Sequence, residues 1–217
     1  MATAEGAQIP RPRIIGIAGG TGAGKTTVAR KILRQMPAGQ AALIQHDWYY
    51  RDRPELTLDQ RAALNYDEPA ALDNGLLVDH IEALRAGQAV ECPQYDFATH
   101  LRQQETVRIA PCRIVVVEGI LTFAVAALRE AFDLRLFVDT ADDIRLIRRI
   151  KRDLTQRGRD IDSIQDQYYR TVRPMHRLHV EPNKDHAHLI IPEGGENREA
   201  VDMIVHALLY GLGAGAE

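Results

Sequence analysis

The chain has 217 residues, of which 45% are apolar and 26% are charged, as in an ordinary globular protein. This length fits one domain, or one domain with a small insert. The formal net charge of −3 argues against a global basic field that would bind polymeric nucleic acid or an anionic membrane. No apolar run approaches the roughly 20 residues of a membrane-spanning helix, so we expect no membrane partner.

The two ends of the chain differ from the rest in composition. Residues 1–12 contain two prolines and no apolar run, and the last residues are mostly glycine and alanine. We predict flexible tails at 1–12 and 212–217 around a single domain at 13–211. The first tail does not resemble a signal peptide. The two cysteines lack a CxxC or metal-ligand spacing and are typical of reduced thiols, so we expect a cytoplasmic protein.

Short apolar runs recur along the chain without alternating with polar residues, which indicates strands buried on both faces. A helical pattern starts at Lys25, directly after the first run, and ends before Pro37. We therefore predict an α/β fold with a doubly wound five-stranded parallel sheet flanked by helices. Its strands are expected at residues 13–18, 41–45, 113–117, 134–138 and 188–191.

The turn after the first strand matches the pattern G-x-x-x-x-G-K-[ST]. A glycine-rich turn lets several backbone N–H groups point at a phosphate, and the following helix adds its partial positive charge. Lys25 is expected to reach the β- and γ-phosphates, and the Thr26 hydroxyl to bind Mg²⁺. This predicts a P-loop NTPase-type fold that binds ATP and Mg²⁺ through Gly19, Gly20, Thr21, Gly22, Ala23, Gly24, Lys25, Thr26 and Thr27.

A phosphate-binding turn fits a kinase, a switch GTPase or a nucleotide-binding regulator without turnover. The GTPase pattern N-K-x-D is approached at residues 183–186, but Asp185 comes one residue too early and follows no strand. The third strand ends in Glu118-Gly119, and no D-x-x-G switch follows it. These departures argue against a GTPase, and the other two classes stay open.

Two segments interrupt the alternation of strands and helices. Residues 89–110 are predicted to form an inserted β-hairpin, with strands at 90–94 and 106–109, because a hairpin cannot belong to a parallel sheet. Residues 142–178 are predicted to form a helical lid of two helices broken at Gly158. The first lid helix is crowded with arginines, whose mutual repulsion a bound triphosphate would relieve; for Arg145 we expect instead a solvated side chain paired with nearby aspartates.

Acidic residues follow two of the predicted strands, at the edge where open α/β sheets bind ligands. Glu118 ends the most apolar strand, where a charge is costly unless it faces a site. A carboxylate near the phosphates suits Mg²⁺, so we take Thr26, Glu118 and Asp47 as candidate metal ligands.

Beyond the phosphate turn, the motifs resemble the uridine kinase (uridine–cytidine kinase) family of P-loop kinases. They occur in the family's order over about residues 13–197. The matching stretches are Ile15-Gly-Ile-Ala-Gly-Gly-Thr21, His46-Asp-Trp-Tyr-Tyr50, Asn65-Tyr-Asp67, Tyr95-Asp-Phe97, Val117-Glu-Gly-Ile-Leu121, Phe137-Val-Asp-Thr140, Arg148-Arg-Ile-Lys-Arg-Asp153, Arg157-Gly-Arg-Asp160 and Val172-Arg-Pro-Met175.

The resemblance implies roles for the charged residues. Asp47 corresponds to the catalytic base that takes the proton of the acceptor hydroxyl, and Lys25 and Arg157 would neutralise the transferring phosphate. Arg149 would contact the ribose or the acceptor oxygen, and Arg152 the ATP side.

The resemblance also implies a ribose clamp at Asp67, whose carboxylate can accept hydrogen bonds from both the 2′- and 3′-hydroxyls. Asn65 and Tyr66 precede it as in the family, and Tyr66 is counted with the substrate-binding residues. Glu68 stands where family members usually carry histidine.

The predicted hairpin loop carries candidates for base recognition. Tyr95 and Phe97 offer aromatic faces for a pyrimidine. A neutral His100 has one donor and one acceptor nitrogen, so it could donate to uracil O4 or accept from the cytosine amino group. By resemblance, Arg159 and Gln167 would also reach the base.

Together these features predict transfer of the ATP γ-phosphate to the 5′-hydroxyl of uridine and cytidine, giving UMP and CMP in pyrimidine salvage. Alternatives are a kinase resembling phosphoribulokinase or pantothenate kinase, or a non-catalytic regulator. The resemblance suggests a homo-oligomer, specifically a tetramer. Glu193 stands where the family usually has arginine near the adenine side, which leaves the choice between ATP and GTP open.

Overall fold

The computed structural model describes residues 11–213. Most of the two predicted tails, residues 1–10 and 214–217, therefore lies outside the described residues. The last helix, α8 (Arg198–Gly213), extends two residues into the segment 212–217 that we expected to be a tail. Within residues 11–213, no helix is long and apolar enough to cross a membrane.

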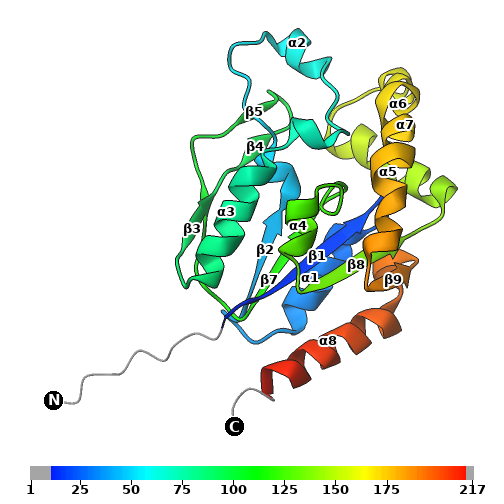
Figure 1. The fold of residues 1–217 in the computed structure, drawn as a ribbon. Coiled ribbons are helices and arrows are strands. Elements are labelled where there is room, and N and C mark those ends of the chain that lie inside the picture. Colours follow the sequence, from blue (N-terminus) through cyan, green and yellow to red (C-terminus); the bar gives the residue numbers. More distant parts are fainter. Residues whose placement is uncertain (1–10, 214–217) are drawn as a thin grey trace.

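Five parallel strands form the central sheet, in the order β2-β7-β1-β8-β9 (Figure 1). Each predicted strand is confirmed, with its ends displaced by at most one residue. The strands are β1 (Arg13–Gly19), β2 (Ala41–Gln45), β7 (Ile114–Glu118), β8 (Leu134–Asp139) and β9 (Leu189–Pro192). The parallel order with crossovers between non-adjacent strands is the predicted doubly wound arrangement.

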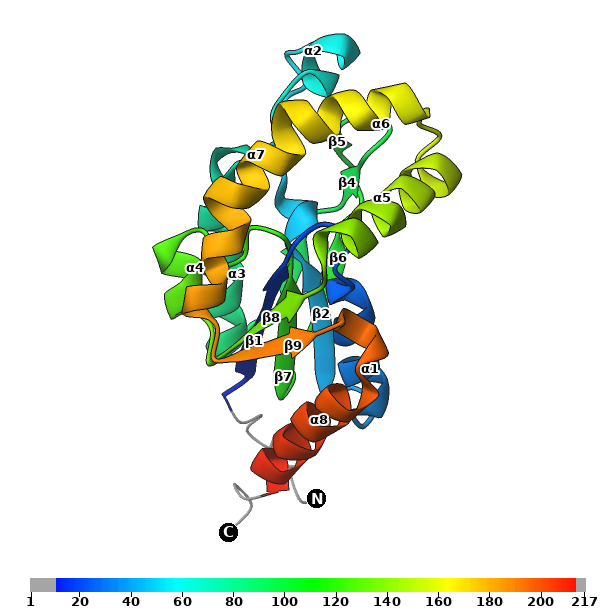
Figure 2. The same cartoon turned by 90° about the vertical axis from the view of Figure 1, so that its right-hand side faces the viewer.

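Helices cover both faces of this sheet (Figures 1 and 2). On β7, Val115 and Val117 belong to one buried cluster, whereas Ile114 and Val116 belong to the other. The first cluster includes side chains of α3 (Asn74–Arg85) and α4 (Ala126–Glu130), and the second includes those of α1 (Lys25–Gln35) and α8. Because side chains alternate between the faces of a strand, an unbroken apolar strand supplies both layers.

The inserted hairpin, called the β-arm, is confirmed, but its two predicted strands are shorter than expected and a second strand pair follows them. β3 (Val90–Cys92) pairs antiparallel with β6 (Val107–Ile109), and a second pair, β4 (Tyr95–Asp96) and β5 (Leu101–Arg102), extends the arm toward its tip. Pro93 separates β3 from β4, since proline cannot donate to the ladder. The short helix α2 (Leu58–Ala62) begins with a capping box between Thr57 and Gln60.

The lid consists of two helices that meet at Gly158, as predicted. α5 (Asp142–Gln156) ends there because Gly158 has a φ of 60°, and α6 (Ile161–Gln167) starts with the Asp160 side chain accepting from Ser163 N at 2.7 Å. The second helix runs past the predicted end at residue 178. It continues through wide π-helical turns at Tyr168–Val172 and His176–Val180, on either side of α7 (Arg173–Met175), into a 3₁₀ turn at Glu181–His186.

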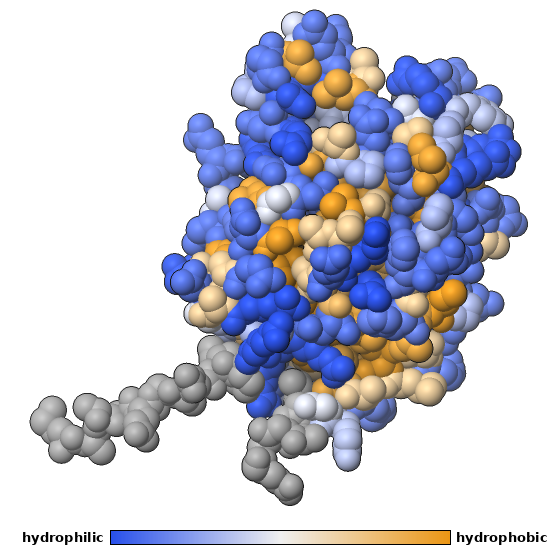
Figure 3. Space-filling view, in the orientation of Figure 1, coloured by the Kyte–Doolittle hydropathy of each residue, from blue (hydrophilic) through white to orange (hydrophobic). Residues whose placement is uncertain are grey.

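The tip of the β-arm (β4 and β5), α2 and α6 gather at one end of the molecule, and the start of β1 and the end of α8 lie at the other (Figure 1). The surface seen from this side is mostly hydrophilic, with apolar side chains in small patches (Figure 3). The carboxyl ends of the parallel strands face the end that holds the arm and the lid. The fold thus places the phosphate turn, the arm and the lid around one opening.

Candidate active site

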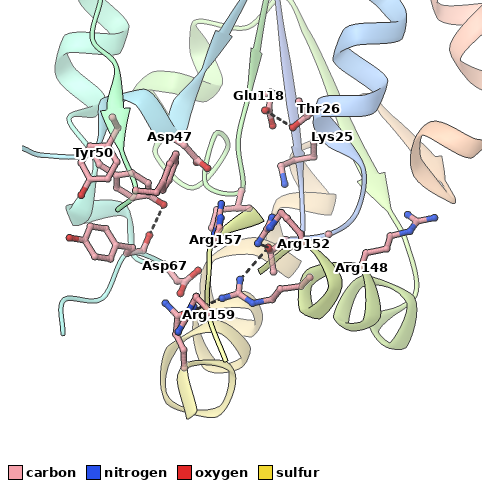
Figure 4. A pocket seen from close by; sticks show the side chains of 18 of the residues that line it. Lys25, Thr26, Asp47, Tyr50, Asp67, Glu118, Arg148, Arg152, Arg157 and Arg159 are labelled. Carbon is pink, nitrogen blue, oxygen red and sulfur yellow. Dashed lines mark hydrogen bonds between the residues drawn. The ribbon is translucent and has the colours of Figure 1, made fainter. Parts of the chain in front are cut away.

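A cavity of about 880 Å³ lies between the phosphate turn, the β-arm and the lid. Its walls include every substrate-binding residue that the sequence predicted, the lid arginines to which a role was assigned, and both candidate carboxylates of the sheet edge. From the phosphate turn, the lining includes Thr21, Gly22, Gly24, Lys25, Thr26 and Thr27, whereas Gly19, Gly20 and Ala23 lie behind it. Segments far apart in the sequence thus converge on one site (Figure 4).

The phosphate turn is held from behind by the first lid helix. Gly22 and Gly24 have φ angles of 77° and 98°, which favour glycine. A Cβ on Gly20 would collide with the Arg145 guanidinium, and one on Gly22 with the Arg145 carbonyl. Glycine is therefore needed here for close backbone packing as well as for conformation.

Arg145 is not the solvated side chain that we expected. It does pair with Asp142, but it is only 9% exposed, and its Nε donates to the Thr140 carbonyl at 3.0 Å. The sequence prediction failed because helix periodicity does not show that the Arg145 face of α5 packs on the phosphate turn that follows β1. Arg145 supports the turn instead of lining the cavity.

The start of α1 brings a cation and a hydroxyl to the end of β7. Thr26 Oγ1 donates to Glu118 Oε1 at 2.8 Å, and Lys25 Nζ donates to the Gly20 carbonyl at 3.1 Å. Burial lowers the pKa of Lys25 and raises that of Glu118, and the Coulombic attraction between the two partly offsets both shifts. The buried lysine can therefore bind a phosphate, and the neighbouring carboxylate and hydroxyl can bind a cation.

The oxygens of Thr26 and Glu118 fit Mg²⁺, which prefers hard oxygen ligands. Among residues 11–213, no three His, Cys, Asp or Glu side chains are placed to hold a metal by themselves. Such a partial set matches the way Mg²⁺ is usually bound, through one or two carboxylates together with substrate phosphates and water.

Asp47 follows β2 in the 3₁₀ turn His46–Tyr49. Strand register brings it to the same edge as Glu118, because Gln45 is paired with Glu118 and Asp47 is two residues further on. Its carboxylate points into the cavity (Figure 4). Behind it, the buried His46 is anchored by a 2.9 Å hydrogen bond between its Nε2 and Asn74 Oδ1. Asp47 is therefore held between the phosphate turn and the opposite wall.

That opposite wall is aromatic. The Tyr66 ring is stacked on His100, with centroids 5.0 Å apart and an interplanar angle of 18°, and Tyr95 contacts Phe97 edge to face at 5.4 Å. Tyr50, which the sequence analysis did not assign to the site, joins the cluster 5.2 Å from Tyr66. A signal was available, because Tyr50 lies three residues after Asp47 within a matching motif.

Two polar atoms in this wall are buried and have no hydrogen-bond partner among the described residues: Tyr95 Oη and His100 Nδ1. Burial, with the nearby Arg61 and Arg159 guanidinium groups, lowers the pKa of His100 and keeps the imidazole neutral. Because buried polar groups normally have partners, these atoms fit a flat ligand that carries its own donors and acceptors.

Asp67 lies on the same side, and the lid contacts it directly. Thr171 Oγ1 donates to Asp67 Oδ2 at 3.1 Å, and Asn65 Oδ1 accepts from Asp67 N at 3.1 Å. Burial raises the pKa of Asp67, and the positive charge of Arg149 opposes that shift. Glu68, at the position of the family's usual histidine, accepts from Asn65 Nδ2 at 3.3 Å and leaves Asp67 facing the cavity. The sequence carried no signal for Thr171, since its contact spans 104 positions.

The lid residues Arg152, Arg157 and Arg159 face the cavity from the other side (Figure 4). Arg149 donates to Gln167 Oε1 at 2.8 Å and to Thr21 Oγ1 at 3.3 Å, so one side chain joins both lid helices to the phosphate turn. The Arg157 guanidinium lies 5.0 Å from the Phe97 ring centroid, and Arg159 also bonds Gln167. The structure therefore brings together the residues that the sequence assigned to phosphate and nucleoside, while their individual roles stay predictions.

Residues 14–200 match the model of the Phosphoribulokinase / Uridine kinase family. The chain belongs to this family. Among its curated relatives, a protein of Chloroflexus aggregans named "Uridine kinase" is 52% identical over 89% of this chain and 93% of the relative. Proteins of the same name from Halalkalibacterium halodurans and Clostridium perfringens are 49% and 47% identical, over 90% and 94% of this chain and 92% and 98% of the relatives.

Solved structures support the fold of this family member. A putative fructose transport system kinase from Silicibacter has a TM-score of 0.64 at 20% identity, covering 85% of this chain and 92% of that one. A D-glycerate 3-kinase from Cryptococcus neoformans has a TM-score of 0.61 at 16% identity, covering 87% and 88%. At these identities the likeness establishes the P-loop kinase fold alone.

Residues 183–186, which approach a GTPase motif in sequence, have a structural role here. Lys184 forms ion pairs with Asp139 and Glu181.

Proposed function

We propose that the protein is a nucleoside kinase that transfers the ATP γ-phosphate to the 5′-hydroxyl of uridine and cytidine. The observation that carries this proposal is the position of Asp47, in one cavity between the phosphate turn and the wall that holds Asp67 and the aromatic cluster. Relatives about half identical over nearly their whole length are named uridine kinases, which supports the same acceptor here.

In the proposed reaction, Asp47 accepts the proton of the 5′-hydroxyl as that oxygen forms a bond to the γ-phosphorus. The bond between the γ-phosphorus and the bridging oxygen breaks, and the products are a nucleoside 5′-monophosphate and ADP. Lys25 and Arg157 neutralise the negative charge on the transferring group. Thr26 and Glu118, with Asp47 nearby, are the residues that would hold Mg²⁺, which supplies charge neutralisation at the phosphates.

The lid and the arm have separate parts in this proposal. Residues 142–178 close over the phosphates and exclude water, which limits hydrolysis of ATP without an acceptor. Residues 89–110 supply the base-binding wall, where a neutral His100 donates to uracil or accepts from cytosine. Asp67 accepts from the ribose 2′- and 3′-hydroxyls and so favours ribose over deoxyribose.

Other kinases of this fold act on different acceptors, so the acceptor has to be tested. We would measure ADP release with uridine, cytidine, ribulose 5-phosphate and pantothenate, each with ATP and with GTP as donor. Turnover with both pyrimidine nucleosides is expected, together with none on the other two acceptors. Turnover of ribulose 5-phosphate or pantothenate instead, or nucleotide binding with no turnover of any acceptor, would overturn the proposal.

We also propose a cytoplasmic protein that takes part in pyrimidine salvage and forms a homotetramer, as the family resemblance suggests. Light scattering coupled to size-exclusion chromatography would measure the oligomeric state. A mass near 24.3 kDa, that of one chain, would contradict the tetramer without affecting the proposed reaction.

A further inference from the structure

One carboxylate of the lid is completely buried and surrounded by arginines. Asp153, in the last turns of α5, has 0% exposure. Its carboxylate lies 2.9 Å from Arg152 and 3.5, 3.6 and 3.9 Å from Arg149, Arg157 and Arg159. Its backbone carbonyl accepts from Arg159 N at 3.2 Å, so both the side chain and the main chain of Asp153 contact the segment around the Gly158 break.

All four arginines around Asp153 line the cavity. Arg149 and Arg152 approach Thr21 Oγ1 at 3.3 and 3.5 Å, and Arg157 lies over Phe97. These three guanidinium groups thus have one side toward Asp153 and another toward the phosphate turn or the aromatic wall, whereas Arg159 bonds Ser163 and Gln167 of α6. Asp153 itself is not part of the cavity lining, so it contacts the arginines from behind.

Burying a carboxylate is unfavourable unless charged partners compensate it, and four neighbouring guanidinium groups repel one another. Of the four arginines, Arg152 alone hydrogen-bonds the Asp153 carboxylate, and the other three lie at ion-pair distances. The carboxylate therefore acts on them through its charge: it offsets their mutual repulsion and attracts the four guanidinium groups toward one point. The other aspartates of α5 differ, since Asp142 contacts only Arg145 among the arginines and Asp143 is exposed.

We propose that Asp153 is a positioning residue that serves as an internal counter-ion and directs the lid arginines toward the transferring phosphate. This inference rests on the proposed function, because it concerns the same phosphoryl transfer. Asp153 touches neither nucleotide nor nucleoside and acts only through the arginines. When phosphate arrives, the arginines already point at it and need little rearrangement, which is the advantage of a preorganised site.

The proposal predicts that a change at Asp153 lowers turnover without weakening the binding of an anion. Replacing Asp153 by asparagine keeps the size of the side chain but removes its charge, so the cavity becomes more positive and its affinity for an anion does not fall. The arginines lose their common partner and no longer share one orientation, so turnover falls. A side chain that only supports the fold would instead weaken binding and turnover together.

The test compares Asp153→Asn with Asp143→Asn, which makes the same chemical change at an exposed position of the same helix. We expect kcat for uridine to fall at least tenfold in Asp153→Asn, while the dissociation constant of a non-hydrolysable ATP analogue does not rise and depends more steeply on salt. Asp143→Asn should stay within twofold of the unmodified protein in both quantities. A kcat within threefold of the unmodified value, or an equal loss of kcat and analogue affinity, would overturn the proposal.

A second variant covers the case in which Asp153→Asn does not fold. Asp153→Glu keeps the charge but moves the oxygens by one methylene, so misdirected arginines should again lower kcat while the analogue still binds. An unchanged kcat in Asp153→Glu would show that charge alone suffices and would reject the positioning role. If the unmodified protein phosphorylates another acceptor, the proposed function fails. Measuring kcat of Asp153→Asn and Asp143→Asn with that acceptor would still test the role of Asp153.

Discussion

The two halves of the cavity are built in different ways. In the phosphate half, Lys25, Thr26 and Glu118 are fixed by strand register and by close packing of glycines on Arg145. In the nucleoside half, Asp67 is bonded by the lid residue Thr171, and Tyr95 Oη and His100 Nδ1 have no partner among the described residues. The first half consists of sheet and helix, and the second of an arm and a lid.

This difference corresponds to two tasks: one half binds the triphosphate, and the other recognises the acceptor. A triphosphate is the same in every turnover, so a rigid site made of backbone turns and a helix N-terminus serves it well. The acceptor has to enter, be recognised and leave, which favours side chains on elements that are joined to the sheet by few segments. Substitutions in the two halves should therefore affect different kinetic quantities.

Asp47 lies between the halves, and its substitution should have the largest effect. For Asp47→Asn we expect kcat for uridine to fall by about 10²- to 10⁴-fold, because the amide cannot accept the hydroxyl proton. The dissociation constant of an ATP analogue should change little, since Lys25 and the phosphate turn are intact. Steady-state kinetics and calorimetry measure the two quantities, with Asp59→Asn on the exposed face of α2 as the matched control. Undiminished turnover would rule out Asp47 as the base.

Substitution of Asp67 should affect only the nucleoside half. In Asp67→Asn the charged acceptor for the ribose hydroxyls is lost, so kcat/KM for uridine should fall by about 10- to 100-fold, as for hydrogen bonds to charged groups. The kcat/KM for 2′-deoxyuridine, which offers one hydroxyl fewer, should fall less. The ratio of kcat/KM for uridine to that for 2′-deoxyuridine should therefore decrease. Equal losses on the two nucleosides would contradict a clamp that uses both hydroxyls.

The neutral His100 predicts a pH effect on base selection. Burial lowers its pKa below the ordinary value of 6.5, so the ring is neutral above that pH and takes a proton only as the pH falls further. The protonated ring can donate but cannot accept. The ratio of kcat/KM for cytidine to that for uridine should therefore be constant from pH 8 to about 6.5 and fall severalfold below it.

A variant gives the control for this pH effect. His100→Phe keeps an aromatic ring against Tyr66 but has no titratable nitrogen, so its ratio should show no such decline. A decline of the same size in His100→Phe would show that another group is responsible.

The smallest expected effect is on stability in the phosphate half. Burial lowers the pKa of His46, so the folded protein keeps it neutral while the unfolded chain takes a proton below pH 6.5. Its contribution is therefore complete above about 6.5 and is lost as the pH falls, by at most about 1.4 kcal/mol per pH unit. The free energy of unfolding of His46→Gln should decline less steeply than that of the unmodified protein between pH 7 and 5.5. Parallel profiles from denaturant titrations would contradict this.

Other buried groups with shifted pKa values also contribute to the pH dependence of stability, which is why the two proteins have to be compared. Burial lowers the pKa of His176 as well, with the same sign as His46. Asp67 and Glu118 have raised pKa values, so their contribution to stability is lost as the pH rises. The difference between variant and unmodified protein removes these shared contributions.

The sequence by itself determined the sheet and the phosphate turn, and it named most of the residues that line the cavity but missed Tyr50. Unbroken apolar runs can be satisfied only between two layers of helices, so all five strands could be predicted within a residue. The G-x-x-x-x-G-K-[ST] spacing depends on local backbone geometry, which a sequence pattern records directly. Asp47, Asp67, Tyr95 and Phe97 could be proposed as site residues because they lie within motifs that resemble one family and occur in a fixed order.

Only the tertiary structure decided which partners these side chains have. Three features show this: Arg145 is buried, Thr171 bonds Asp67, and four arginines surround Asp153. Each depends on contacts between different elements or between the two sides of a helix break. The contact from Thr171 spans 104 positions, so no local pattern encodes it. Burial also set the direction of the pKa shifts of Lys25 and Glu118, because desolvation depends on the surrounding packing and not on the residue type.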